Sequence, residues 1–451
     1  WIIDYNRQSL DGVVNDALFQ KIQGFFANVG WQVVTLKYGR LLEAARRGPA
    51  GEALIQWIDQ CPNQLYSALT FRGGVAWREQ LGRDLRGVAG MRELLDTHDD
   101  AALHRLMTNL GGHDLETILD AYGSVDDDAP RCFVAYTIKG FGLPLAGHKD
   151  NHSGLMSPAQ MEDFRQRMGV PPGAEWDPHV GMRHPSADVK RFLAGVPYAG
   201  RTARQPAPVV PIQSLSVPAG TSLSTQEAFG RLLADIARSD TPLARHLVTT
   251  SPDVTVSTNL SGWVNRRGVF RSWEIKDVFR DPQLASSQKW DQGPGGQHIE
   301  LGIAENNLFL LLGQLGLAAD FFGARLLPLG TVYDPFINRG LDALIYACYQ
   351  GARFMLVATP SGISLAPEGG AHQSINTPLI GLAQDGLVYF EPAYADELTS
   401  ILQWGFAHLQ APGGSSVYLR LSTRALPQPQ RSLEASDHLD ILRGAYWRVP
   451  P

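Results

Sequence analysis

The chain has little cysteine, no long apolar run and no strong excess of charge. Its three cysteines, Cys61, Cys132 and Cys348, stand far apart among 451 residues. This spacing argues against a disulfide framework or a cysteine metal site, and it favours a reducing compartment, the cytoplasm. No stretch approaches the roughly 20 apolar residues that a membrane-spanning helix needs. The net charge of −6 provides no attraction to nucleic acid or to anionic membranes, so we expect neither as a partner.

The composition that remains is that of a globular protein with room for two or three domains. Hydrophobic residues make up 44% of the chain and charged residues 19%. The chain opens in an apolar run at Trp1 without a methionine, and near Ile441 it begins a further element that soon stops. These ends lead us to expect an internal piece of a longer protein.

Apolar runs typical of strands alternate with helical patterns along most of the chain. The runs span residues 1–4, 31–36, 132–137, 246–250, 325–329, 353–359, 387–391 and 415–421. The helical patterns span residues 16–28, 54–60, 101–110, 226–237 and 395–407. This alternation predicts an α/β fold whose parallel sheets are covered on both faces, and such sheets bind ligands at the carboxyl ends of their strands.

Proline and glycine mark the expected domain boundaries. Pro171-Pro172-Gly173 and two later proline-rich stretches predict an extended linker. A helix is expected to begin after it, with Ser222 or Ser224 as the cap and Glu227 close behind. The predicted order is a domain at 1–170, the linker at 171–221, a second domain at 222–425 and the start of a third domain at 426–451.

Glu305 stands where a short apolar run meets the start of a buried helix, in the stretch from His298 to Asn307. Desolvation on one side disfavours the charged form of such a carboxylate. One partner that suits it is a ring nitrogen that must be protonated to become reactive. The alternative is a carboxylate that stabilises the helix N-terminus, and the motif alone leaves both open.

Other polar and aromatic groups follow the predicted strands. Asn6 and Gln8 come directly after the first strand, where amide oxygens suit Mg²⁺, although a turn built on Asn and Asp explains them as well. Lys139 ends a strand, and His152 lies in the polar loop after it. These two residues suit an anionic substrate, although a solvated loop also explains them.

Three further positions share this location after strands. Tyr333 and Phe336 bracket Asp334-Pro335 and suit a wall for a flat heteroaromatic ring, although aromatics at such a place are usually core. His372, in a glycine-rich loop, is a candidate acid, base or oxyanion donor. Asp253 holds the same topological position on the neighbouring strand.

The order of these motifs resembles that of the thiamine-diphosphate enzymes of the transketolase superfamily. The order is Asn-x-Gln-x-Leu-Asp, Thr-Ile-Lys-Gly, a histidine loop, Gly-Ile-x-Glu, the aromatic pair and Glu-Gly-x-x-His. The chain resembles in particular the homodimeric type of the bacterial pyruvate dehydrogenase decarboxylating component. The resemblance implies two doubly wound parallel-sheet domains of the thiamine-diphosphate-binding type, which hold thiamine diphosphate and Mg²⁺ between different subunits of a homodimer.

The resemblance also implies roles for individual residues. It makes Glu305 the carboxylate that shares a proton with the pyrimidine nitrogen, and it places Tyr333 and Phe336 around that ring. Asn6 and Gln8 match the second half of the family's metal motif, whose first half, a Gly-Asp-Gly, would lie upstream of Trp1. The implied substrate-binding and catalytic residues are His372, His152, Lys139 and Asp253.

The implied reaction is decarboxylation of a 2-oxo acid, with pyruvate favoured, and transfer of the acyl group to a lipoyl group on an acyltransferase subunit of a dehydrogenase complex. This piece alone is expected to be inactive, since the upstream half motif is missing. Asp253-Val254 lacks one carboxylate of the family's acidic pair, the loop after His372 is short, and His152-Ser153-Gly154 is similar to a transketolase motif. A transketolase acting on sugar phosphates and a non-catalytic scaffold therefore stay open as alternatives.

Overall fold

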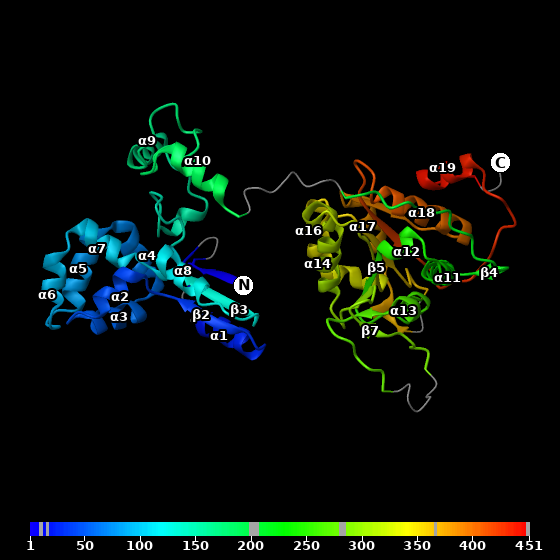
Figure 1. The fold of residues 1–451 in the computed structure, drawn as a ribbon, viewed down its shortest axis with the longest axis horizontal. Coiled ribbons are helices and arrows are strands. Elements are labelled where there is room, and N and C mark those ends of the chain that lie inside the picture. The colour runs from blue at the N-terminus through cyan, green and yellow to red at the C-terminus, as the bar shows by residue number, and fades with distance from the viewer. Residues whose placement is uncertain (9–11, 15–17, 198–206, 279–285, 365–367, 448–451) are drawn as a thin grey trace. The chain divides into compact units, whose positions relative to one another are not determined.

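The computed structural model describes residues 1–8, 12–14, 18–197, 207–278, 286–364 and 368–447. The chain divides into two compact units, Trp1–Gly200 and Arg201–Pro451, which are described separately (Figure 1). Both are of the predicted α/β class with parallel sheets.

The first unit is built on a small parallel sheet. Its described residues form three strands in the order β1 (Ile2–Tyr5), β3 (Arg131–Tyr136) and β2 (Gln32–Leu36). All three lie where the apolar runs predicted strands. The central strand β3 is the most buried, with Cys132 and Val134 inaccessible to solvent, as expected for a continuous apolar run in a parallel sheet.

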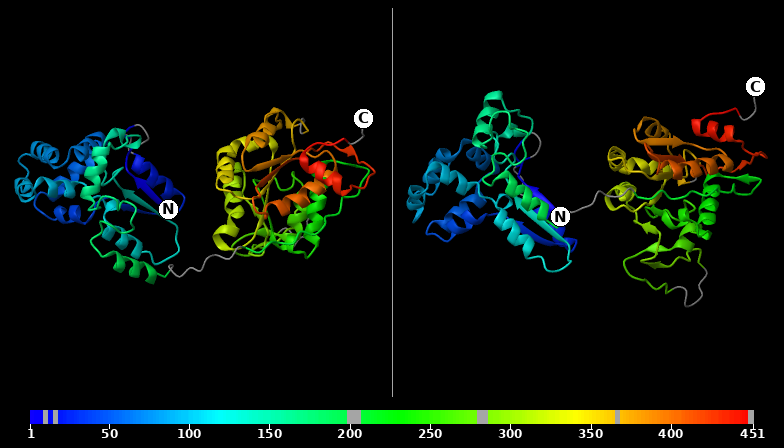
Figure 2. Two further views of the ribbon diagram at one scale, coloured as in Figure 1. Left: turned by 90° about the horizontal axis from the view of Figure 1, so that it is seen from above. Right: turned by 45° about the horizontal axis from the view of Figure 1, so that its top comes forward.

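A cluster of helices packs beside this sheet within the first unit (Figure 2). Its core is formed by side chains with no exposed surface, among them Leu42, Leu54, Trp77 and Leu103. The helices of the unit are α1 (Leu18–Asn28), α2 (Arg40–Arg46), α3 (Gly51–Gln60), α4 (Asn63–Arg72), α5 (Gly74–Asp84), α6 (Met91–Thr97), α7 (Asp100–Met107), α8 (Leu115–Gly123), α9 (Pro158–Arg167) and α10 (Ser186–Gly195).

Helix α10 lies inside the range 171–221 that we predicted as linker, so the described part of this range is not uniformly extended. The helix begins just after Pro185 and carries Asp188 in its first turn. Proline before a helix and an acidic residue in its first turn both favour a helix start. The proline-rich composition of the range hid this short helix.

The second unit is built on a larger parallel sheet. In its described residues eight strands pair in parallel throughout. Their order is β11 (Leu387–Phe390), β12 (Ser416–Arg420), β10 (Met355–Ala358), β9 (Leu327–Val332), β5 (Leu247–Ser251), β8 (His298–Glu300), β6 (Val269–Phe270) and β7 (Gln292–Gly293).

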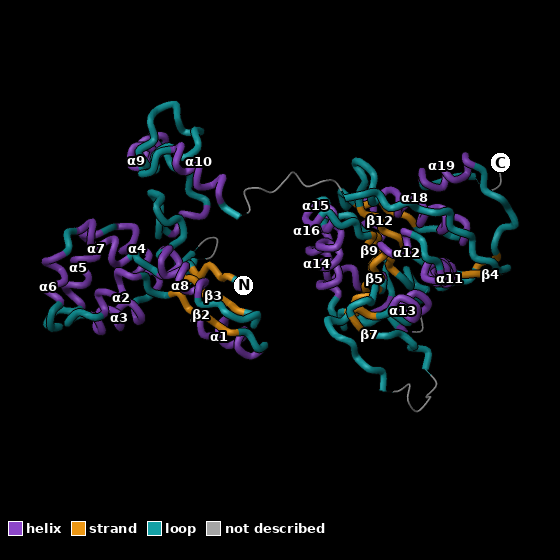
Figure 3. Tube along the Cα trace, viewed as in Figure 1, coloured by secondary structure: helices purple, strands orange, loops and turns teal. Residues whose placement is uncertain are grey.

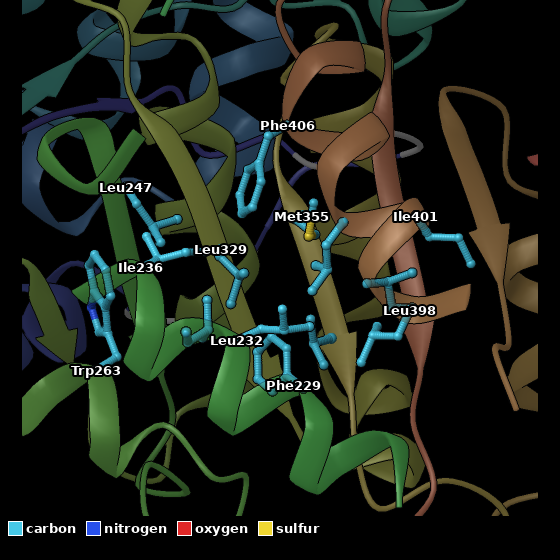
Figure 4. Packing of buried hydrophobic residues seen from close by; sticks show 14 of the residues in the cluster. Phe229, Leu232, Ile236, Leu247, Trp263, Leu329, Met355, Leu398, Ile401 and Phe406 are labelled. Carbon is cyan, nitrogen blue, oxygen red and sulfur yellow. The ribbon is translucent and has the colours of Figure 1, made fainter. Parts of the chain in front are cut away.

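Helices cover both faces of this sheet (Figure 3). Met355 and Val357 pack into one hydrophobic core, and the intervening Leu356 and Ala358 pack into another, as the alternation of side chains along a strand requires. The first core lies under α11 (Thr225–Arg238), α13 (Ser261–Arg267) and α18 (Ala395–His408), and Figure 4 shows Phe229 and Leu232 of α11 against the strands. The second lies under α14 (Glu305–Gly316) and α16 (Leu341–Tyr349).

The start of α11 and the residues after β12 both test predictions made from the sequence. Ser224, one of the two caps that the sequence predicted, caps α11 and accepts a hydrogen bond from the Glu227 backbone N–H at 3.1 Å, whereas Ser222 lies in β4. Residues predicted to start a third domain pack onto this unit. Strand β13 (Leu426–Pro427) pairs with β4 (Ser222–Leu223), and α19 (Ala435–Arg443) contributes Ile441 to the core beside α18.

Within the described residues, all three cysteines are free thiols. None of the helices in those parts of the chain combines the length and the apolar character needed to cross a lipid bilayer.

Candidate active site

The carboxylate of Glu305 lies at the first position of α14, directly after strand β8 and a short loop. Leu308 and Leu312 of the same helix are fully buried beneath the sheet, and this packing draws the start of the helix inward. Glu305 is 7% exposed, and its Oε1 accepts a hydrogen bond from Nη1 of Arg339 at 2.7 Å. The carboxylate is therefore both at a helix N-terminus and paired with a cation, an arrangement that the motif alone did not predict.

The aromatic pair predicted around a flat ring lies beside the predicted histidine. The Tyr333 and Phe336 ring centroids are 5.7 Å apart, and His372 lies 5.6 Å from the first and 5.3 Å from the second. Arg339 places its Cζ 3.6 Å from the centroid of Phe336. Nδ1 of His372 is buried and has no hydrogen-bond partner among the described residues. Glu305 and these rings thus form one cluster, joined through Arg339.

A buried ion pair fixes the segment that carries the aromatic pair. Asp334, with no exposed surface, accepts hydrogen bonds from Nη2 of Arg420 at 3.0 Å and from the hydroxyl of Tyr418 at 3.1 Å. It also accepts from the hydroxyls of Ser374 and Thr377, the second at 2.9 Å, which lie just after His372 in the chain. One carboxylate therefore holds the aromatic segment, the histidine loop and the end of β12 together.

The ionisation states of this group follow from its contacts. Burial lowers the pKa of Arg420, but its hydrogen bonds to Asp334 and Tyr389 and the charges of Asp334 and Glu391 together outweigh burial and raise the pKa above its ordinary value. Burial, with the Asp334 charge beside it, raises the pKa of Tyr418. The guanidinium thus stays charged and the phenol stays protonated, so both donate to the carboxylate.

A second carboxylate, that of the partly buried Glu300 at the end of β8, ties together the loops around Asp253 and Glu305. Its Oε1 accepts from the backbone N–H of Asp253 at 2.7 Å, and its Oε2 accepts from the hydroxyl of Thr255 at 2.7 Å. Nε2 of the fully buried His298 lies 3.5 Å from the same oxygen. Burial raises the pKa of Glu300, but the hydrogen bonds with His298, Thr255 and the backbone N–H of Asp253, with the charge of His298, together outweigh burial and lower the pKa to about 2.

Asp253 itself is exposed, with a left-handed φ of 64°. Its backbone N–H bond to Glu300 fixes this turn after β5, so the predicted residue lies at the expected edge of the sheet.

In the first unit, Asn6 and Gln8 form a tight turn after β1. Oδ1 of Asn6 accepts a hydrogen bond from the backbone N–H of Gln8 at 2.9 Å, and the intervening Arg7 has a left-handed φ of 63°. Nε2 of Gln8 donates to the carbonyl oxygen of Gly147 at 3.5 Å. This is the Asn-based turn that the sequence left open beside the metal role. Ser9, Leu10 and Asp11 of this motif lie outside the described residues.

Lys139 and His152 lie together in the first unit. Nζ of Lys139 is 3.1 Å from Nδ1 of His152, and the backbone oxygen of Lys139 accepts from Nδ2 of Asn151 at 2.6 Å. A cavity of about 600 Å³ beside this loop is lined in part by Phe71, Arg72, Gly147, His148 and Lys149. The site residues thus form two groups, one in each unit.

Sequence reasoning missed four of the groups that organise the second unit's site. Arg339, Arg420, Glu300 and His298 were not singled out, although His298 and Glu300 lie in the same stretch as Glu305. The position of Arg420 at the end of a predicted strand was a usable signal, because that edge of a parallel sheet gathers site residues.

Comparisons with known proteins show which proteins the chain is similar to. Residues 221–429 match the family described as the transketolase pyrimidine binding domain. The pyruvate dehydrogenase E1 component of Corynebacterium glutamicum is 27% identical over 99% of this chain and 50% of that protein. That of Mycobacterium tuberculosis is 26% identical over the same shares. The chain spans about half the length of the curated relatives it matches.

Solved structures share the fold. The transketolase of Campylobacter jejuni aligns with this chain with a TM-score of 0.56 and 16% sequence identity, and the alignment covers 95% of this chain and 52% of the transketolase chain. That of Leishmania mexicana has a TM-score of 0.54 at 17% identity and covers 96% and 52%. The predicted resemblance to the thiamine-diphosphate-dependent transketolase superfamily is confirmed by the family match and by the similar sequences. In sequence the chain is similar to pyruvate dehydrogenase E1 components.

The second unit's residues fit the pyrimidine half of thiamine diphosphate. A buried carboxylate, Glu305, lies beside a tilted aromatic pair and beside a histidine whose Nδ1 is buried without a partner in the described structure. For the metal, the described residues contain no group of three or more His, Cys, Asp and Glu side chains that could hold an ion. Mg²⁺ at Asn6 and Gln8 stays a prediction.

Proposed function

We propose that the chain is the cofactor-binding part of a thiamine-diphosphate-dependent enzyme that decarboxylates a 2-oxo acid, with pyruvate as substrate. The observation that carries the proposal is the buried Glu305 carboxylate clustered with Tyr333, Phe336 and His372 in the region matched to the pyrimidine-binding family. The names of the relatives, pyruvate dehydrogenase E1 components, favour a 2-oxo acid over a sugar phosphate.

The assembly around this site belongs to the same proposal. The first unit is the later part of a diphosphate-binding domain, and the protein acts as a cytoplasmic homodimer with the active site between subunits. The acyl group passes to a lipoyl group on an acyltransferase subunit of a dehydrogenase complex.

Each group has a role that follows from its chemistry. Bound thiamine diphosphate supplies the carbon nucleophile and the electron sink that decarboxylation needs. Glu305 holds a proton at its carboxylate and gives it to, or takes it from, the edge of the pyrimidine. Tyr333 and Phe336 orient a flat ring by stacking and exclude water. His372 offers a ring nitrogen to the oxygen of the substrate carbonyl.

In the first unit the proposed roles concern charge. Asn6 and Gln8 offer amide oxygens to Mg²⁺, which takes its remaining ligands from phosphate and water. Lys139 and His152 attract the carboxylate of the 2-oxo acid, and Asp253 of the second unit helps to position the substrate.

The test is carbon dioxide release by the full-length protein with thiamine diphosphate and Mg²⁺. We expect release from pyruvate and none from a ketose phosphate donor. Glu305→Gln should lower turnover at least about a hundredfold, because proton transfer at this position is lost. Glu227→Gln is the matched control, since this exposed glutamate pairs with Arg231 at 2.7 Å on the outside of α11. Near-normal turnover by Glu305→Gln would refute the assignment, and turnover of the ketose alone would make the protein a transketolase.

A further inference from the structure

Arg339 engages two of the groups assigned to the pyrimidine ring at the same time. Its Nη1 donates to Oε1 of Glu305 at 2.7 Å, and its Cζ lies 3.6 Å above the ring of Phe336. The side chain of Arg339 is 51% exposed, whereas that of Glu305 is 9% exposed. The guanidinium therefore lies at the mouth of the site, between the buried carboxylate and the solvent.

A guanidinium and an aminopyrimidine present the same two features to a protein. Each is planar, each has N–H groups along its edge that a carboxylate accepts, and each has a flat face that stacks on an aromatic ring. At 3.6 Å the guanidinium is in van der Waals contact with Phe336, so a second planar group has no room on that face. One oxygen of Glu305 is occupied by the same side chain.

We propose that Arg339 is a displaceable stand-in for the pyrimidine ring. In the cofactor-free protein its guanidinium fills the place between Glu305 and Phe336, and the side chain swings into solvent when the cofactor enters. This inference rests on the proposed function, because it takes the occupant of the site to be thiamine diphosphate.

The arrangement has a physical reason. A buried carboxylate without a partner is unfavourable. The cation of Arg339 therefore neutralises the charge of Glu305 until the pyrimidine ring binds. The competition weakens apparent cofactor affinity by the fraction of molecules in which the site is open. An ion pair whose cation is half exposed, together with a cation–π contact, corresponds to an effect of about tenfold.

The experiment is calorimetric titration of the full-length protein with thiamine diphosphate and Mg²⁺. Arg339→Met removes the charge and the N–H groups while keeping the length of the side chain, and we expect about tenfold tighter binding. Arg339→Lys, which keeps the charge and loses the planar face, should fall between this variant and the unmodified protein. Arg231→Met is the matched control, since Arg231 is 47% exposed and pairs with Glu227 at 2.7 Å; its affinity should not change.

Chemical rescue gives an independent readout. In Arg339→Ala, methylguanidinium should fill the vacated place and weaken thiamine diphosphate binding in a concentration-dependent way, with no such effect on the unmodified protein. Unchanged or weaker cofactor binding by Arg339→Met, with normal binding by the unmodified protein, would overturn this inference and leave the proposed function standing. Absence of binding by every protein, including the unmodified one, would overturn both.

Discussion

Replacing Asp334 by asparagine removes the negative charge from the centre of the second unit while keeping nearly the same shape. The variant leaves Arg420, whose side chain is 5% exposed, without its buried counter-charge. Glu391, about half exposed, remains 2.7 Å from the other end of the guanidinium and compensates in part. The hydroxyls that donate to Asp334 retain one amide oxygen as acceptor.

The expected loss of stability in Asp334→Asn follows from the contacts that remain. Removing one partner of a buried ion pair costs about 3–5 kcal/mol. The contact with Glu391 and the remaining amide oxygen bring our expectation to the lower end, about 3 kcal/mol. For a unit of this size, 1 kcal/mol shifts the melting temperature by roughly 2–4 °C, so Asp334→Asn should melt about 6–12 °C lower.

The assay is thermal and urea unfolding of the whole chain, followed by circular dichroism. Asp342→Asn, at an exposed position at the start of α16, is the control and should change stability by less than about 0.5 kcal/mol. The double variant Asp334→Asn/Arg420→Met should recover part of the loss, because it removes the uncompensated charge. A loss below about 1 kcal/mol for Asp334→Asn, or no recovery in the double variant, would refute this reasoning.

Two further predictions concern stability. Burial raises the pKa of Glu300, but the hydrogen bonds with His298, Thr255 and the Asp253 backbone N–H and the charge of His298 together outweigh burial. The net fall in the pKa from 4.5 to about 2 corresponds to about 3 kcal/mol. Since the folded pKa is the lower one, this stability is present above about pH 5 and is lost as the pH falls toward 2. Glu300→Gln should therefore be destabilised in urea at pH 7 and differ little from the unmodified protein at pH 2; a pH-independent difference would contradict this. Gly340→Ala would place a Cβ 2.4 Å from Cδ2 of Phe309, so we expect a loss of about 1–3 kcal/mol in the same assay, and unchanged stability would show that the ring yields freely.

The fold followed from local patterns because the strands of a parallel sheet are continuous apolar runs that the sequence shows directly. The short helix at residues 186–195 was hidden by its proline-rich surroundings, since few apolar positions mark it.

Local sequence patterns predicted some residues of the candidate site and missed others. Glu305 and His372 were found because each follows a strand, where a parallel sheet gathers its polar groups. Arg339 and Arg420 were missed because their roles depend on pairing with residues 34 and 86 positions away, which no local pattern encodes. The resemblance to a family could supply residues with known roles, but it could not supply a side chain that lies in the place of a ligand.

The two edges of the second unit's parallel sheet should differ in how far their loops tolerate changes of sequence and length. Asp253, Glu305, Tyr333, Phe336 and His372 follow the carboxyl ends of β5, β8, β9 and β10, so the loops that enter the opposite ends of the strands carry none of these residues. The turn at residues 411–414, which leads into β12, is such a loop; open space surrounds Gly413 in it, although the left-handed φ of 70° favours glycine at that one position. Insertions, affinity tags and fluorescent labels belong on that side of the sheet, and natural length differences among relatives should accumulate there.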